Sequence, residues 1–348
     1  MSLLDQYDFT LPPELIAKEP VHPRDAARLF VYDTATDTVV LDTFANLGAH
    51  LPAQSLLVMN DTKVVPARLW LKKPTGGKIE VLLMMNEYRP GDAVVKGVVD
   101  RKVEVGTVLS FQSGDTLMVA RQEEQFFFFR PSVDIPVLFA LLQSEGVTPI
   151  PPYIKESPLD EQALRSEYQS VLAKYPASVA APTASLHFTE PLLAQLAAQG
   201  TTHTEVTLHV GAGTFAPIDE TNFRTKQLFT EYYEITAESA SRINAAKRSG
   251  VPVIPVGTTA LRTLESAAHD RGVQVGANHT NIFIFPPYEF QVADALITNF
   301  HVPRSSLLLL VDALLAHKKA PRRILDLYAI AIEERFRFYS FGDGMLIR

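Results

Sequence analysis

The sequence has 348 residues, of which 47% are hydrophobic and 20% charged, with a formal net charge of −7 and no cysteine. This composition is typical of a globular protein long enough for two domains. The missing cysteine excludes disulfides, a thiol nucleophile and cysteine-ligated metal sites. Residues 1–20 lack the apolar run of a signal peptide, and the apolar stretch 307–314 is interrupted by Asp312 and is too short to cross a bilayer. We therefore expect a cytoplasmic protein.

From about residue 64 to residue 129, short apolar segments alternate with turn residues. The segments are KIEVLLMM, AVVKGVV, TVLSF, TLMVA and QFFFFR, separated by glycine, proline and serine. Repeated short strands at this spacing predict a small β-barrel. We interpret Phe126–Phe129 as part of a strand that is buried on both faces, rather than as a platform for stacking bases.

After Pro149 the pattern changes to alternating strands and helices. A helix is expected after Thr189, which can cap it, and Gly200 should end it. The further expected elements are a strand over 205–210, a helix over 238–247, strands over 251–256, 280–285 and 295–300, and helices that begin after 257–259 and at 305. This alternation predicts an α/β architecture with a mostly parallel sheet.

Three histidines stand beside small residues or at the expected end of a strand. His187 follows SVAAPTASL, His209 precedes the glycine turn 211–213, and His301 follows a strand that ends in TNF. Open α/β sheets bind ligands at the carboxyl ends of their strands. A single histidine at such a place is more often structural, but three of them indicate that at least one is functional.

Gly257, Thr258 and Thr259 form a turn from an expected strand into a helix. The first N–H groups of a helix are unpaired and attract a carboxylate or a phosphate, although the threonines could equally be ordinary caps. Arg262 and Glu265 are three residues apart on this helix and share a face. They are either a surface pair or, at the mouth of a site, groups that hold a carboxylate and a ribose hydroxyl or an amine.

Two runs of basic residues contain no acid. The first contains Lys63, Arg68, Lys72, Lys73 and Lys78, and the second contains Lys318, Lys319, Arg322 and Arg323. On their own such runs are typical of solvated faces. The sequence has no HExxH motif, no complete P-loop and no complete GxGxxG motif, so metalloprotease, kinase and dehydrogenase functions have little support.

The sequence resembles a known family along almost its whole length. The matching segments are, in order, RDAARL (from Arg24), NDTKVVPARL (Asn60), TGGKIEVLL (Thr75), PPYIK (Pro151), SVAAPTASLHFT (Ser178), TLHVGAGTF (Thr207), EYYEI (Glu231), VGTTALRTLES (Val256), LITNFHVPRSSLLLLV (Leu296) and FRFYSFGDGMLI (Phe336). In this collinear order they are similar to the S-adenosylmethionine:tRNA ribosyltransferase-isomerases of queuosine biosynthesis.

The resemblance implies a chain of two domains, because members of this family insert a β-barrel domain into an α/β domain. We expect residues 1–61 and 150–348 to form the large α/β catalytic domain with its mostly parallel sheet. Residues 62–149 should form the inserted small β-barrel domain. We expect a monomer or a weak homodimer.

The implied reaction moves the ribosyl part of S-adenosylmethionine onto 7-aminomethyl-7-deazaguanine at the wobble position of tRNA. The transferred unit rearranges to an epoxycyclopentanediol, giving epoxyqueuosine with release of adenine and methionine. A base must remove a proton next to the sulfonium, an acid must protonate adenine, and polar groups must hold the methionine carboxylate and the ribose. The sulfonium supplies the driving force, so we expect S-adenosylmethionine as cosubstrate and no metal. A tRNA substrate requires phosphate contacts, and the run from Lys63 to Lys78 is the first candidate for them.

On this resemblance the candidate catalytic residues are His187, His209, Lys155, Glu265 and His301, without separate assignment of base and acid. The candidates for binding S-adenosylmethionine are Gly211, Gly213, Thr214, Gly257, Thr258, Thr259, Arg262 and Asn299. Asp61 and Tyr168 are further polar candidates from matching segments. Lys155 follows a stiff proline segment that would fix its direction, and its alternative is a solvated lysine in a linker.

The sequence departs from the family pattern at several positions. Ser185 and Pro287 each replace a glycine, Lys226–Phe229 replaces a His-x-Met-His element, Val98–Val99 lies where an Arg-Pro pair is expected, Glu167 replaces an arginine and Asn281 an aspartate. Two alternatives to the transferase-isomerase therefore stay open. One is a diverged paralog that binds nucleoside or tRNA without the transfer chemistry, and the other is a related transferase with a different acceptor.

Overall fold

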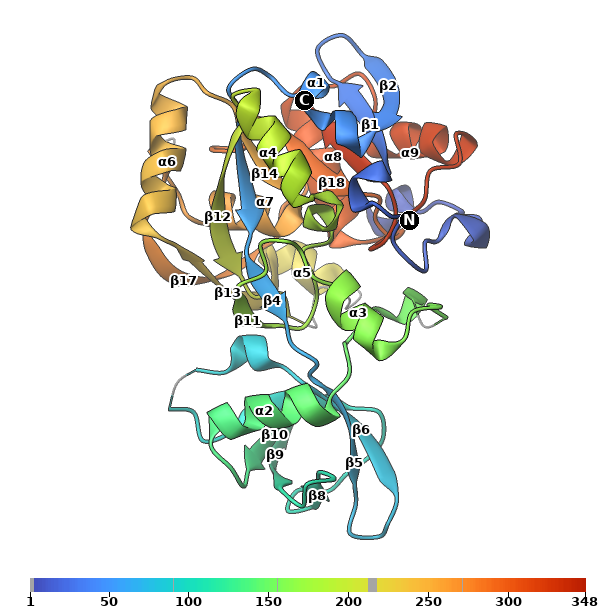
Figure 1. The fold of residues 1–348 in the computed structure, drawn as a ribbon, viewed down its shortest axis with the longest axis vertical. Helices are drawn as coiled ribbons and strands as arrows, with labels where there is room; N and C mark the ends of the chain where they lie inside the picture. The colour runs from blue at the N-terminus through green and yellow to red at the C-terminus, as the bar shows by residue number, and fades with distance from the viewer. Residues whose placement is uncertain (1–2, 90, 155, 212–217, 271) are drawn as a thin grey trace.

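The structure is a computed structural model that describes residues 3–89, 91–154, 156–211, 218–270 and 272–348. A large α/β part contains both ends of the described chain, and a small barrel lies below it in Figure 1. This arrangement confirms the predicted fold class, an α/β domain interrupted by a small β-barrel. Among the described residues no helix combines the length and the apolar character needed to cross a membrane.

The α/β part is built on a nine-stranded sheet. In spatial order its strands are β17 (Gly276–Ile282), β13 (Gln227–Ile235), β12 (Thr202–Leu208), β3 (Leu56–Asn60), β14 (Val253–Val256), β18 (Leu296–Asn299), β19 (Gly344–Ile347), β1 (Arg28–Asp33) and β2 (Thr38–Thr43). The four central strands from β12 to β18 are mutually parallel, as predicted. The flanks are mixed: β1 is parallel to β19, and the other flanking pairs are antiparallel.

Helices cover both faces of this sheet because the side chains of its strands alternate between two apolar cores. Leu56 and Val58 of β3 face the core that contains α6 (Ala237–Arg248) and α7 (Thr258–Ser266), whereas Leu57 and Met59 face the core under α4 (Glu190–Ala198). In β1, Phe30 packs with α8 (Ser306–His317) and α9 (Ile324–Glu333). The remaining short helices are α1 (Leu47–His50), α3 (Glu161–Glu167) and α5 (Glu220–Thr225).

The barrel is a closed sheet of six strands. Their order is β10 (Phe126–Pro131), β7 (Val95–Val99), β6 (Lys78–Leu83), β5 (Arg68–Lys72), β8 (Val108–Ser110) and β9 (Thr116–Glu123). Every second residue of these strands points inward, and α2 (Ile135–Glu145) adds Leu138, Leu141 and Leu142 to the same core. The five predicted apolar segments therefore coincide with five of the six strands.

The prediction that Phe126–Phe129 is buried on both faces is wrong. Phe127 and Phe129 are inside the barrel, whereas Phe126 and Phe128 are only partly buried on its outer surface. Cations lie over the two outer rings: Lys96 Nζ is 3.9 Å from the ring centre of Phe126, and Arg121 Cζ is 3.5 Å from that of Phe128. A small barrel has one apolar interior, so only one face of a strand needs to be buried.

Two short strands connect the barrel to the α/β part. β4 (Thr62–Val64) precedes the barrel in the chain, and β11 (Tyr175–Ser178) follows the barrel. The two strands pair in parallel. A second two-stranded sheet, β15 (Ala268–His269) and β16 (Gly272–Val273), lies at the end of α7. The predicted domain boundaries, at residues 61/62 and 149/150, stay a prediction.

Candidate functional site

A cavity of about 480 Å³ opens at the carboxyl ends of β14 and β18. Its walls come from the turn into α7, the segment after β18, the first turn of α8, residues 180–184, and the side chains of Tyr153, Tyr168 and Tyr339. The volume lies within the range of about 300–1,000 Å³ that is usual for ligand sites. The carboxyl ends of parallel strands are also where open α/β sheets bind ligands.

The start of α7 forms one wall of this cavity. Gly257 has a φ of 89°, a conformation that side chains seldom adopt, and it turns the chain from β14 into the helix. Gly257, as the N-cap, has no side chain that could cap the helix, and Thr258 and Thr259 line the cavity. The hydroxyl oxygen of Thr259 accepts a hydrogen bond from Asn60 Nδ2 at 3.2 Å. The first N–H groups of α7 are therefore available to an anionic group in the cavity.

Two buried polar atoms of the cavity wall have no hydrogen-bond partner among the described residues, Tyr168 Oη and Asn299 Oδ1. The two side chains are only 1% and 2% exposed. Native proteins rarely leave such groups unpaired, because each unsatisfied group destabilises the fold by about 1–3 kcal/mol. Tyr168 Oη also lies close to Ser340 and to the backbone of Ala181, which act on its hydroxyl, so Asn299 Oδ1 is the clearer candidate to bind a ligand in the cavity.

His301 also lines the cavity, directly after β18. Its Nε2 is 3.0 Å from Thr298 Oγ1, and its backbone N–H donates to the hydroxyl of Tyr328 at 2.7 Å. Burial lowers the pKa of His301 to about 4. The imidazole is thus neutral at neutral pH and can accept a proton.

His187 lies behind Asn299 and is not part of the cavity wall. Its Nε2 is 3.2 Å from Asn299 Nδ2, and its ring centre is 4.8 Å from that of Phe44. Burial, together with the charges of Arg337 and Arg24, lowers the pKa of His187 to about 3.

His209 lies outside the cavity as well, although the next residue, Val210, lines it. The Nδ1 atom of His209 is 2.7 Å from Thr62 Oγ1, and its ring stacks on Tyr232 with the centres 5.7 Å apart. Burial lowers the pKa of His209 to about 4. Nearby, burial raises the pKa of Asp61 to about 6, while Asp61 accepts a hydrogen bond from Thr207 at 2.7 Å.

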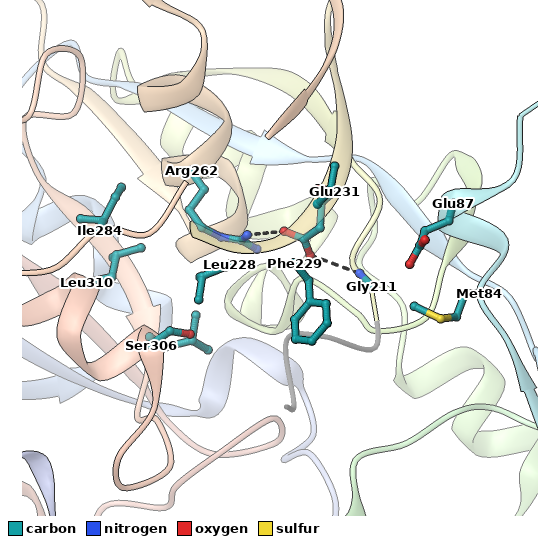
Figure 2. A pocket seen from close by; sticks show the side chains of 12 residues that line it. Met84, Glu87, Gly211, Leu228, Phe229, Glu231, Arg262, Ile284, Ser306 and Leu310 are labelled. Carbon is teal, nitrogen blue, oxygen red and sulfur yellow. Dashed lines mark hydrogen bonds and ion pairs between the residues drawn. The ribbon is translucent and has the colours of Figure 1, made fainter. Parts of the chain in front are cut away.

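Arg262 belongs to a second, much smaller cavity of about 20 Å³ at the junction with the barrel. Figure 2 shows its guanidinium directed at the carboxylate of Glu231, whose other oxygen accepts a hydrogen bond from Gly211 N at 3.2 Å. Met84 and Glu87 of the barrel complete this cavity. The arginine predicted to hold a substrate carboxylate is therefore paired with a carboxylate of the protein.

Glu265 is separated from both cavities, since neither wall includes it. Its carboxylate accepts hydrogen bonds from the backbone N–H groups of Gln291, Val292 and Ala293 at 2.9–3.1 Å. Every residue of α7 from Thr258 to Glu265 is buried, so the helix has partners all around rather than one functional face. The two cavities themselves are neighbours, because Ser306 and Leu307 line both.

Three predicted site residues, Lys155, Gly213 and Thr214, lie outside the described residues. Of the positions that depart from the family pattern, Ser185 is buried, and its hydroxyl has no partner among the described residues. Phe229 is 39% exposed and lines the smaller cavity (Figure 2).

The first basic run lies largely on the outer surface of the barrel. Lys72 and Lys78 are opposite each other on β5 and β6 and are exposed, as is Lys63 on β4. Arg68 pairs with Glu80 at 2.5 Å, and Lys73 donates to the backbone oxygen of Lys102 at 3.1 Å.

Sequence reasoning missed Trp70, the only tryptophan of the chain, which is 48% exposed on the same face of β5 as Lys72. The alternation of Arg68, Trp70 and Lys72 along one strand was the available signal. The second basic run has other partners: Lys318 donates to the backbone oxygen of Asp294 at 2.9 Å, and Arg323 pairs with buried Asp312. These contacts favour Lys63, Lys72 and Lys78 of the first run as the exposed basic surface.

Comparison with known proteins decides the family. The model of the queuosine biosynthesis protein family matches residues 4–347. The chain belongs to this family. It is 43% identical to the S-adenosylmethionine:tRNA ribosyltransferase-isomerase of Carboxydothermus hydrogenoformans and 42% identical to that of an Anaeromyxobacter species, over 99% of the chain and 99% and 98% of the two relatives.

A solved structure of a related protein covers the whole length too. The crystal structure of S-adenosylmethionine tRNA ribosyltransferase from Thermotoga maritima matches 99% of this chain and 100% of its own, with 31% identity and a TM-score of 0.55. The resemblance inferred from the collinear segments is thus confirmed. Within the described part of the chain no three histidine, aspartate or glutamate side chains gather as a metal site would require. The expectation of no metal stays a prediction.

Proposed function

We propose that this chain transfers the ribosyl group of S-adenosylmethionine to 7-aminomethyl-7-deazaguanine in tRNA and isomerises it, with release of adenine and methionine. It is an enzyme of queuosine biosynthesis, a transferase and isomerase like its relatives. The observation that carries the assignment of the site is the 480 Å³ cavity at the carboxyl ends of β14 and β18. Its wall contains Asn299 Oδ1, which has no hydrogen-bond partner among the described residues.

The cavity offers groups for each part of S-adenosylmethionine. The unpaired N–H groups at the start of α7, with the hydroxyl of Thr258, suit the methionine carboxylate. Arg262 is a poorer candidate for that carboxylate because it already pairs with Glu231. The apolar parts of the wall, including Val210 and Leu307, suit the adenine ring.

We assign His301 as the base that removes the proton next to the sulfonium. Among the described residues it is the histidine that lines the cavity, and its neutral ring can accept a proton. The C–H electron pair stays on the carbon, where the positive sulfur stabilises it, while His301 gains the proton. The tyrosine hydroxyls of the wall, at Tyr153 and Tyr168, can donate a hydrogen bond to the departing adenine. Burial raises the pKa of both hydroxyls, so they are hydrogen-bond donors rather than strong acids.

The tRNA acceptor requires a second surface, and the outer face of the barrel provides one. Lys72 and Lys78 can contact phosphates. Trp70, which lies between Arg68 and Lys72 along β5 and opposite Glu80, can stack on an unpaired base. We propose that this face holds the tRNA while its wobble nucleotide enters the α/β part. A monomer suffices for this arrangement because both surfaces belong to one chain.

One assay tests the proposed function. The protein is incubated with S-adenosylmethionine and tRNA that carries the aminomethyl-deazaguanine, and released adenine, released methionine and the mass of the modified nucleoside are measured. We expect release of both products only when the tRNA is present, unchanged by a chelator. A requirement for added metal would contradict the metal-free reaction. No release in any condition would favour the binding paralog.

A further inference from the structure

The side-chain amide of Asn299 lies between the large cavity and two buried partners. Its Nδ2 is 3.2 Å from His187 Nε2 and 3.3 Å from the backbone oxygen of Tyr339. Its Oδ1 has no partner among the described residues, and Asn299 belongs to the cavity wall. One end of this amide is therefore held by the protein, and the other end is left for a ligand.

The backbone oxygen of Tyr339 determines which end is which. A carbonyl oxygen only accepts hydrogen bonds, so the amide atom next to it must be the NH₂ group. The same NH₂ group faces His187 Nε2, which must then accept its second hydrogen. It follows that His187 carries its proton on Nδ1 and that its Nε2 lone pair is engaged.

The ring of His187 is fixed from other sides as well. Phe44 packs against it with an interplanar angle of 34°. Gly344 of β19 lies so close that an added Cβ would be 2.7 Å from the Phe44 ring and 3.6 Å from His187 Cδ2. The position of the imidazole, and through it the direction of the Asn299 amide, is thus determined by the core of the sheet.

We infer that Asn299 binds substrate through Oδ1, which accepts a hydrogen bond from an N–H or O–H group of S-adenosylmethionine, and that His187 is the positioning residue that sets this direction. The inference rests on the proposed function. It gives His187 a role other than that of a base, since its ring is outside the cavity wall and Nε2 is already an acceptor. With the opposite amide direction, Asn299 would present hydrogens to the donor groups of the ligand.

The tautomer of His187 can be measured in the unmodified protein. With ¹⁵N-labelled histidine, NMR should show Nδ1 protonated and Nε2 unprotonated between about pH 5 and 8, because burial keeps the ring neutral there. Protonated Nε2 would overturn the inference, since the amide would then have to be reversed. This measurement does not depend on catalysis, so its outcome is independent of the proposed function.

Two variants separate positioning from catalysis. His187→Leu removes the acceptor, and we expect S-adenosylmethionine affinity to fall about tenfold, the effect of one lost hydrogen bond, with kcat at saturation within about threefold. His187→Gln restores an acceptor and should keep affinity within about threefold, with an unchanged pH profile. A fall in kcat of about 10² or more in both variants would identify His187 as a base and overturn the inference. Calorimetry of the wild type first establishes that it binds S-adenosylmethionine, and failure there would contradict the proposed function instead.

The group that Asn299 contacts can be located with a second ligand. Asn299→Ala is titrated with S-adenosylmethionine and with 5′-methylthioadenosine, which lacks the amino-acid part. Equal losses of affinity for both would place the donor on the nucleoside, and a loss for S-adenosylmethionine alone would identify the methionine ammonium. No loss for either ligand, in a variant that melts as a folded protein, would overturn the role of Asn299.

Discussion

The large cavity and the outer face of the barrel differ in how exposed and how firmly held their polar side chains are. In the cavity His301 is neutral and Asn299 is held in one direction, away from bulk water. On the barrel the side chains of Lys72 and Lys78 are exposed, and Trp70, on the same face of β5 as Lys72, is half-exposed. Oriented hydrogen bonds discriminate between small ligands, whereas exposed charges attract a polyanion over a distance and are screened by salt. In the function proposed above, the site of chemistry is therefore separate from the surface that binds tRNA.

The largest expected effect concerns the proposed base. His301→Gln should lower kcat by about 10² to 10⁴, since general-base catalysis contributes that much, while tRNA affinity stays unchanged. His269→Gln is the matched control, because His269 is an exposed histidine far from the cavity wall. Adenine release under saturating substrate measures the effect. A variant with wild-type kcat would show that His301 is not the base. It would also contradict the proposal that chemistry occurs in the cavity while tRNA binds on the barrel.

The buried histidines predict a stability that depends on pH. Burial lowers the pKa values of His187, His209 and His301 to about 3, 4 and 4, below the ordinary value of 6.5. Below pH 6.5 the unfolded chain therefore binds protons that the folded chain excludes. The free energy of unfolding decreases as the pH is lowered. Asp61 acts in the opposite direction and offsets the contribution of one histidine. Its pKa is raised to about 6, so the folded chain binds a proton there that the unfolded chain does not. The free energy of unfolding should therefore change by up to about 3 kcal/mol per pH unit.

Denaturant unfolding between about pH 5 and 6.5 measures this slope, and His187→Gln should reduce it by about one proton. A free energy of unfolding that does not change over this pH interval would show that the three histidines are solvated. The cavity and the outer face of the barrel would then no longer differ in their exposure to water.

On the barrel, Trp70→Ala should weaken tRNA binding by about 5- to 150-fold, the usual contribution of one stacked base. Val108→Ala is the control, since Val108 is another exposed apolar residue of the barrel. Replacing Lys72 and Lys78 by alanine should lower the slope of log affinity against log salt by about 0.7–0.9 for each lost phosphate contact. Unchanged binding of S-adenosylmethionine would sharpen the comparison, and an unchanged salt slope would return this face to ordinary solvated surface.

The smallest expected effect concerns Phe229, which lies between the two regions. It lines the smaller cavity, and its ring centre is 6.5 Å from that of Phe126 on the barrel. We expect Phe229→His to change kcat by less than about tenfold, or about 1.4 kcal/mol in barrier, because the base lies in the larger cavity. Phe229→Leu controls for loss of the ring. If the histidine instead activates an inactive protein, the chain is the diverged paralog.

Much of the fold could be predicted from the sequence because its local signals agree with one another. Thr189 caps α4 as expected by accepting from Leu192 N at 3.2 Å, and α8 begins directly after Ser305. The alternation of the barrel segments fixed their strands as well. The sequence did not indicate that Phe126 and Phe128 face outward, because their direction depends on how distant strands close the barrel.

The site was predictable where it follows strand ends and not where it depends on tertiary contacts. Gly257, Asn299 and His301 come together because β14 and β18 end at the same edge of the sheet. The partner of Arg262 comes from β13, at Glu231, and no spacing along α7 could indicate it. Trp70 was overlooked because a lone aromatic residue among apolar strand residues is usually part of the core, and only the structure shows that this one is exposed.

The place of β19 has a consequence for how the chain folds. β19 lies between β18 and β1, and Leu29 pairs with Gly344 across nearly the whole sequence. Contacts between such distant residues slow folding, because the intervening chain must be ordered before they form. Until residues 344–347 are in place, β1 and β18 both present unpaired edges that can pair with another chain. We therefore expect a chain cut before residue 344 to aggregate rather than to fold into two stable halves, and the intact chain to gain most from chaperones during this last pairing.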